Sequence, residues 1–298
     1  MNRCNSGTDS GVKRCASHLR SGTVWMREDR IASQCVREAM SFGRYFYPKR
    51  EILYLRCKKM RELLQSAKEN VTFLLVCLLV AVALFVVAML VEKYCLKSVK
   101  EVSKARRVSY IAMFSVLAAV LMFFEIPLFF APSFYEIDLS EVPVLICTFY
   151  LGPVAGVTTE LAKVIIKILL KGTTTAFVGD FANFVVGCSF VLPASIIYHV
   201  KKSKASAITG MAVGTLCMTV FGSLFNAVYL LPKFAQLFGM PLDAIIGMGT
   251  AVNSAINSVS TLVLFAVVPF NLLKGLIVSI ITYLLYKRVE KILVPHDR

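Results

Sequence analysis

The chain has 298 residues, of which 57% are hydrophobic and only 17% are charged. A soluble domain of average composition carries about 25% charged residues. Several apolar runs here reach the roughly 20 residues that span a bilayer as a helix. These numbers exclude an ordinary soluble domain and predict an all-α integral membrane protein.

The formal net charge of +15 is concentrated near the N-terminus, where residues 1–70 contain 15 basic and 7 acidic side chains. Basic residues that flank membrane spans usually set the topology and contact anionic lipid. We do not expect this charge to form the basic surface interleaved with aromatic side chains that is typical of a nucleic-acid interface. We therefore expect a lipid bilayer, and no nucleic acid, as the partner of this charge.

The predicted elements begin with a basic N-terminal tail at 1–70, followed by an extra transmembrane helix at 71–94 and a basic cytoplasmic linker at 95–107. A six-helix core fills 108–293. Its spans are predicted at 108–130, 141–151, 153–170, 176–198, 205–231 and 253–286.

Two of these boundaries depend on proline. Gly152-Pro153 marks a turn between the second and third core spans. The last apolar run is too long for one crossing. Either Pro269 kinks it, or its start lies at the membrane surface.

Orientation follows the rule that cytoplasmic loops are rich in Lys and Arg. The clusters at 97–107, 201–204 and 287–291 are then inside, and the loops 131–140, 171–175 and 232–252 are outside. This assignment puts the basic tail outside, which breaks the rule. Either the tail contains a surface helix near 49–64, or translation starts at Met60, which we favour as a hypothesis.

Five polar residues lie inside apolar runs, and a rise of about 1.5 Å per residue estimates their depth. Asn226 and Asn183 come out roughly 31 and 25 Å above the cytoplasmic ends of their helices, and Asn271 and Lys274 roughly 24 and 20 Å above theirs. Asp180 falls at the outer rim. Convergent polar groups in an apolar cavity are typical of a ligand site. For each Asn alone, bonding between helices is the alternative.

A second polar set, Glu160, Lys163 and Lys167, is spaced at three and four residues and shares one helix face. We interpret it as a structural or partner-facing network, with a Glu160–Lys163 pair, in preference to a ligand contact. On the first core helix Ser115, Ala118 and Ala119 form a face of small residues. Such a face permits close packing, either within the core or against a separate membrane subunit.

Sequence patterns of enzymes are absent from the chain. It has no Gly-rich nucleotide-binding loop, no His-Glu-x-x-His and no Gly-x-Ser-x-Gly. Its nine cysteines show no Cys-x-x-Cys spacing. We predict a protein that is not an enzyme, has no catalytic residues, and needs no metal or cofactor of its own.

Several segments resemble riboflavin-specific substrate-binding (S) components of energy-coupling factor (ECF) transporters. They are the outer-loop block Glu125-Ile-Pro-Leu through Glu141-Val-Pro143, Leu151-Gly-Pro-Val-Ala-Gly156, Thr173-Thr-Thr through Gly179-Asp-Phe-Ala-Asn183, and Pro269-Phe-Asn-Leu-Leu-Lys-Gly275. The resemblance covers about 105–293, essentially the whole predicted core.

The resemblance implies a membrane subunit of the cell membrane that captures riboflavin from outside. It also implies a transmembrane coupling subunit and two ATP-binding-cassette ATPases as partners, which use the ATP. It favours the partner reading for Ser115, Ala118 and Ala119, although the family's usual pattern has Ala where this chain has Ser115.

Flavin chemistry suits the predicted polar residues, because Asn amides both donate and accept hydrogen bonds and aromatic rings can flank an isoalloxazine. The absence of an Arg cluster favours free riboflavin over its phosphate. The predicted substrate site comprises Phe134, Tyr135, Asp138, Thr174, Asp180, Asn183, Asn226, Asn271 and Lys274. The alternatives are an S component for folate or pantothenate, a stand-alone carrier, and an integral membrane enzyme.

Overall fold

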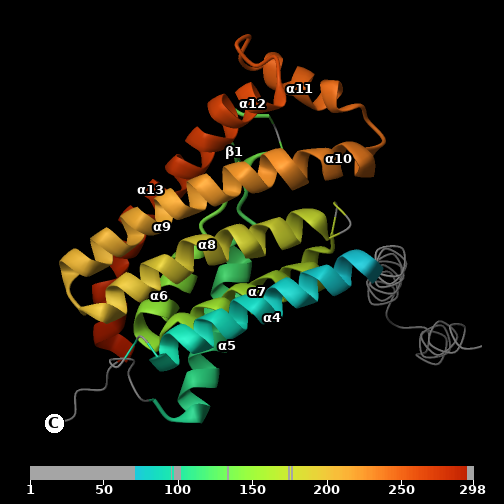
Figure 1. The fold of residues 1–298 in the computed structure, drawn as a ribbon. Coiled ribbons are helices and arrows are strands. Elements are labelled where there is room, and N and C mark those ends of the chain that lie inside the picture. The colour runs from blue at the N-terminus through green and yellow to red at the C-terminus, as the bar shows by residue number, and fades with distance from the viewer. Residues whose placement is uncertain are drawn as a thin grey trace, which may run out of the picture. The chain divides into compact units, whose positions relative to one another are not determined.

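The computed structural model describes residues 71–94, 96, 102–132, 134–173, 175 and 177–293. The predictions for the tail at 1–70, including the start at Met60, lie outside the described residues, and so does the predicted site residue Thr174. Helices dominate the described part (Figure 1). The elements are α4 (Val71–Tyr94), α5 (Lys104–Leu121), β1 (Ile126–Pro127), β2 (Glu136–Ile137), α6 (Glu141–Leu151), α7 (Pro153–Lys171), α8 (Val178–Val200), α9 (Lys204–Phe225), η1 (Asn226–Leu230), α10 (Leu231–Phe238), α11 (Leu242–Thr250), α12 (Val259–Leu262), η2 (Val263–Val267) and α13 (Val268–Leu293).

Four helices among the described residues are long and apolar enough to cross a membrane. They cover Leu75–Tyr94, Val178–Val200, Lys204–Leu237 and Val259–Tyr286. The prediction of an all-α membrane protein is therefore confirmed. The full count of six core spans plus one stays a prediction, because α6 is short and α7 contains several charged residues.

The extra helix α4 is helical from the first described residue, Val71, to Tyr94, and it packs along α7 and α8 (Figure 1). Ala88 is fully buried at this contact, and the ring of Phe73 meets that of Phe181 edge to face at 5.7 Å. At the other end of α4, Glu92 accepts hydrogen bonds from Arg107 Nη2 at 3.0 Å and from the backbone N–H of Val154 at 3.2 Å. One carboxylate thus joins the starts of α5 and α7.

The predicted span 108–130 is wrong at both ends. The helix α5 begins four residues earlier, at Lys104 inside the predicted linker, and ends at Leu121. The segment that follows forms a two-stranded antiparallel sheet, with Ile126 opposite Ile137 and Pro127 opposite Glu136. A run of apolar residues does not distinguish a helix from a short strand, and Pro127 and Pro132 interrupt helical hydrogen bonding here.

The turn between α6 and α7 is confirmed at Gly152-Pro153. Gly152 has φ 97°, a backbone conformation that a side chain would strain. Pro153 is the first residue of α7, where its missing N–H costs nothing.

Two π-helical turns interrupt the long helices, and each precedes a proline by the same spacing. The turn η1 ends two residues before Pro232, and η2 ends two residues before Pro269. Proline has no N–H, and its ring clashes with the carbonyl of the preceding turn. A wider π turn relieves that clash, so the chain continues as one helix from Lys204 to Leu237 and from Val259 to Tyr286.

The outer loop predicted at 232–252 is largely helical, because it contains α10 and α11. The last predicted span starts too early, since residues 253–258 are not helical. Ser258 and Thr261 form a capping box that begins α12. Figure 1 shows β1, α10, α11 and α12 at one end of the helices, called here the β1 end. An apolar core at this end joins Tyr135, Val178, Leu231, Ile245 and Leu262.

Candidate functional site

The candidate site lies at the β1 end, where the segment between α5 and α6 meets η1 and α13. Tyr135 Oη donates a hydrogen bond to Asn226 Oδ1 at 2.8 Å, and both residues are buried. Aromatic rings surround this bond, since the ring centroid of Tyr135 lies 4.6 Å from that of Phe134 and 5.3 Å from that of Phe270. A polar group is thus held inside an aromatic wall, an arrangement typical of small-molecule sites.

Two asparagines of this site are fixed by the same local bond. Asn226 Nδ2 donates to the carbonyl of Gly222 at 2.8 Å, and Asn271 Nδ2 donates to that of Val267 at 3.0 Å. Each bond spans four residues and joins an amide to a carbonyl beside a π turn. Gly222 also lets the two helices approach, because a Cβ there would lie only 3.1 Å from Asn271 Nδ2. The bonds orient both amides and place them on adjacent helices.

Lys274 pairs with Asp138 across the site. Its Nζ donates to Asp138 Oδ2 at 2.9 Å, and both side chains are largely buried. Asp138 Oδ1 accepts the backbone N–H of Ser140 at 2.9 Å. Burial by itself raises the pKa of the Asp138 carboxyl. The charges of Lys274 and Lys163 and the Ser140 hydrogen bond outweigh it and hold that pKa well below its usual range.

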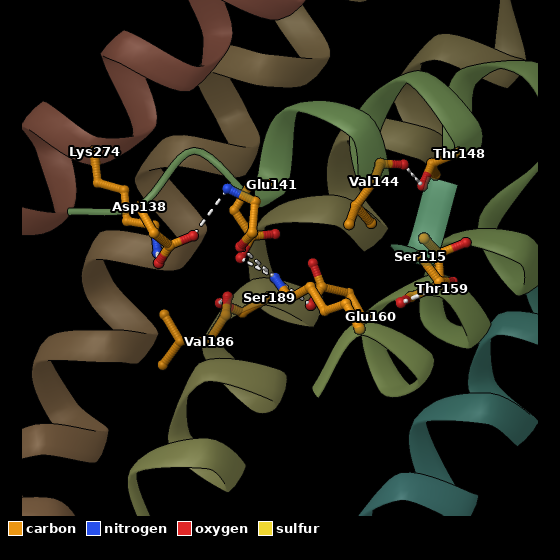
Figure 2. Close-up of polar contacts among 12 residues, drawn as sticks. Ser115, Asp138, Glu141, Val144, Thr148, Thr159, Glu160, Val186, Ser189 and Lys274 are labelled. Atoms are coloured by element: carbon orange, nitrogen blue, oxygen red, sulfur yellow. Dashed lines mark hydrogen bonds and ion pairs between the residues drawn. The ribbon is translucent and has the colours of Figure 1, made fainter. Parts of the chain in front are cut away.

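A second group of charges lies beside Asp138, deep in the helices (Figure 2). Lys163 Nζ lies 2.7 Å from Glu141 Oε1, 2.8 Å from Glu160 Oε2 and 3.0 Å from Ser140 Oγ. Lys163, Glu141 and Glu160 are at most 1% exposed. The predicted Glu160–Lys163 pair is confirmed. The burial of this pair agrees with its interpretation as part of a structural network.

The structure separates the predicted site residues into two groups. Phe134, Tyr135, Asp138, Asn226, Asn271 and Lys274 belong to the site at the β1 end. Asp180 instead accepts a hydrogen bond from Lys167 Nζ of α7 at 2.5 Å. Asp180 Oδ2 and Asn183 Oδ1 are buried without a hydrogen-bond partner among the described residues. Whether these two atoms contact a substrate stays a prediction.

The small residues of α5 do not form a free surface. Ser115, Ala118 and Ala119 are all fully buried within the chain. Ser115 Oγ donates to the carbonyl of Ile111 at 2.7 Å and lies 3.5 Å from that of Thr159 on α7 (Figure 2). Close packing within the core accounts for this burial, because small side chains let α5 approach α7. Contact of the three residues with a separate membrane subunit stays a prediction.

Sequence reasoning missed the residues that complete both groups. Asp138 was expected at the substrate site, but not as the partner of Lys274, and the roles of Ser140 and Glu141 were not anticipated. Glu141 lies at the start of an apolar helix, where an acidic residue is common. Nothing in the sequence therefore predicted its contact with Lys163. Gly187 and Gly222 resemble other small residues of membrane helices, and their role appears only when the facing carboxyl or amide is located.

Comparison with known proteins gives consistent results. The family model "ECF transporter, substrate-specific component" matches residues 106–286. The riboflavin transporter RibU of Staphylococcus aureus (strain TCH60) is 36% identical over 188 residues, which cover 63% of this chain and 92% of the relative. The riboflavin transporter FmnP of Bacillus subtilis (strain 168) is 28% identical over 188 residues, covering 63% of this chain and 93% of the relative.

A solved structure is similar as well. The chain matches the S component of a bacterial ECF transporter with a TM-score of 0.51 and 36% sequence identity, covering 66% of this chain and all of that one. The relatives are transporters rather than enzymes. Together with the apolar helices, these matches show a multi-pass protein of the cell membrane. The chain belongs to the substrate-specific components of ECF transporters, a family whose members work together with further transporter subunits.

Proposed function

We propose that this chain is the riboflavin-binding membrane subunit of an ECF-type vitamin uptake transporter. It captures the vitamin from outside with high affinity and relies on a transmembrane coupling subunit and two ATPase subunits to complete transport. Support comes from curated relatives described as riboflavin transporters, of which this chain covers 92% and 93% of the length. No cofactor takes part, because riboflavin is the substrate and the ATPase subunits use ATP.

The observation that carries the proposal is the convergence of polar groups inside the aromatic wall at the β1 end. Asn226 and Asn271 supply amides in fixed orientations, while Phe134, Tyr135 and Phe270 supply ring surface. An isoalloxazine needs apolar faces and hydrogen-bonding groups at its polar edge, and amides serve as both donor and acceptor. Lys274 Nζ has three N–H donors, and Asp138 takes one of them. It can therefore donate to a flavin carbonyl without losing its partner.

Charge favours riboflavin over an anionic vitamin such as folate or pantothenate. The ammonium of Lys274 is already balanced by the Asp138 carboxylate at 2.9 Å. An added anion would bring a second negative charge into a buried site, at a cost in desolvation. The same argument favours free riboflavin over its phosphate.

A fluorescence titration of the detergent-purified full chain tests the proposal, because bound flavin is quenched by aromatic neighbours. We expect wild-type protein to quench riboflavin stoichiometrically and flavin mononucleotide much more weakly. Losing a buried hydrogen bond costs about 1–3 kcal/mol, so Asn271→Ala and Lys274→Met should each raise the Kd by about 5- to 150-fold. Asn257→Ala and Lys204→Met, at exposed positions, serve as matched controls with unchanged affinity.

Two results would contradict the proposal in different ways. A folded wild-type protein that fails to quench riboflavin rules out this substrate. Quenching that is unchanged in both Asn271→Ala and Lys274→Met keeps the substrate and rules out this site. Uptake by cells that lack the ATPase subunits would support a stand-alone carrier instead.

A further inference from the structure

The buried charge cluster around Lys163 supplies no group to the proposed substrate site. Lys163 is 0% exposed, and its Nζ has Glu141, Glu160 and Ser140 as neighbours at 2.7, 2.8 and 3.0 Å. Two of these contacts are hydrogen bonds, to Glu141 and Ser140, and the third is an ion pair with Glu160. An ammonium group carries three N–H donors, so three neighbours are the most that it can serve. Lys163 therefore cannot satisfy any further carboxyl oxygen.

Two carboxyl oxygens of the cluster are left over. Glu141 Oε2 and Glu160 Oε1 are buried and have no hydrogen-bond partner among the described residues, whereas Glu160 Oε2 has no hydrogen bond there but is held in the ion pair with Lys163 Nζ at 2.8 Å. Gly187 of α8 gives both carboxyls their space, because a Cβ there would lie 2.9 Å from Glu160 Cδ and 3.0 Å from Glu141 Oε1. Figure 2 shows the Glu141 and Glu160 side chains converging on the same place from α6 and α7.

The charges of the cluster do not balance when every group is ionised. The segment before α6 contributes Asp138, α6 contributes Glu141, and α7 contributes Glu160 and Lys163. From α13 comes Lys274, and α8 places the Cys188 thiol near the two glutamates. The nearby Lys167–Asp180 pair is balanced by itself. Three carboxylates against two ammonium groups leave one negative charge, and an uncompensated buried charge is very costly.

We propose that Glu141 and Glu160 form a buried proton site, in which the two carboxyls share one proton in the folded protein. The proton sits between Glu141 Oε2 and Glu160 Oε1, so that one carboxyl O–H donates to the other carboxylate. Two adjacent carboxylates do not both ionise readily, and an O–H···O⁻ bond is among the strong hydrogen bonds of proteins. The shared proton makes the cluster neutral and satisfies both oxygens. This site stands independently of the proposed substrate.

Infrared spectroscopy of the purified full chain tests the proton directly. At pH 7 exposed carboxyls are ionised, so a protonated carboxyl band that shifts in D₂O reports a buried acid. We expect this band in the wild type and in Glu136→Gln, which removes an exposed acid. Glu160→Gln should lose the band, because the amide keeps the shape and replaces the proton donor. Glu141→Gln should lose it too, because the cluster is then neutral without a proton.

Thermal stability gives a second readout. Folded wild-type protein holds one proton that the unfolded chain releases above about pH 5, so its Tm should fall as the pH rises from about 6 to 9. Glu160→Gln should show a flatter profile over this range.

Two outcomes would overturn the proposal. They are a wild type without the band, and a band that persists in both Glu160→Gln and Glu141→Gln. In the first case, a Tm that rises with sodium but not with choline assigns the site to a cation. If Glu160→Gln does not fold, the wild-type band and Glu141→Gln still decide.

Discussion

Single side chains of the candidate site are held by bonds between residues far apart in sequence. Tyr135 bonds to Asn226, 91 residues away, and Asp138 bonds to Lys274, 136 residues away. Both bonds attach the segment between α5 and α6 to the long helices. Their loss would therefore loosen the part of the site that supplies Phe134 and Tyr135.

The Tyr135–Asn226 bond should contribute measurably to riboflavin binding. Tyr135→Phe leaves Asn226 Oδ1 buried without its donor, which costs about 1–3 kcal/mol when no ligand group replaces it. In a double-mutant cycle with Asn226→Ala, residues in direct contact couple by about 0.5–3 kcal/mol. The Kd for riboflavin and the Tm of all four proteins give both energies. Tyr283→Phe, on the exposed side of α13, is the control, and purely additive effects in the cycle would contradict the coupling.

The bounds of individual helices agree with the prediction where one sequence feature dominates, and they differ from it where two features compete. Apolar length alone predicted the helix that ends at Tyr94, and Gly152-Pro153 predicted the boundary of α6 and α7. The segment after Leu121 is apolar but turns into a strand. The long final run divides at the Ser258 cap. Hydropathy reports burial in lipid or protein but not the backbone conformation, so prolines and caps decided these ends.

The π turn before Pro269 should matter for binding although none of its residues belongs to the proposed substrate site. Pro269→Ala restores an N–H, and the helix can relax toward regular α geometry, in which one residue corresponds to about 100° of rotation. We expect riboflavin affinity to fall by about tenfold or more, or about 1.4 kcal/mol, while the Tm stays equal or rises. Pro193, inside the regular helix α8, offers a matched control, because Pro193→Ala should leave affinity unchanged. Wild-type riboflavin affinity in both variants would show that the π turn does not contribute to binding.

For the whole molecule, depth along each helix was predictable, whereas contacts between helices were not. The estimate from helical rise brought Asn226, Asn271 and Lys274 together, because depth depends only on distance from a helix end. It also brought Asp180 to the same side, although Asp180 faces Lys167 on α7. The small residues of α5 are equally suited to an internal and an external neighbour. The direction that each helix face points depends on packing, which one sequence does not specify.

The Asp138–Lys274 pair should make the stability of the whole chain depend on acid. The folded pKa of Asp138 lies below its unfolded value, so its contribution is full above about pH 4 and is lost as the pH falls further. Asp138→Asn should remove this acid dependence and lower the stability at neutral pH by about 3–5 kcal/mol, because Lys274 loses its partner. A Tm series from pH 3 to 7 measures both effects, with exposed Asp243→Asn as control. An unchanged profile in Asp138→Asn would show that the pair contributes little.

The anchoring of α4 restricts how the rest of a transporter can be built around this chain. Glu92 holds the end of α4 to the start of α7, and Phe73 and Ala88 pack it against α8 and α7. While α4 stays docked, that flank is closed to every other subunit. Apolar side chains of α9 and α13 are exposed on other flanks of the described part of the chain. A subunit that moves this protein in the membrane must therefore bind it on a side that α4 leaves free. The contact surface of that subunit should omit the covered faces of α7 and α8.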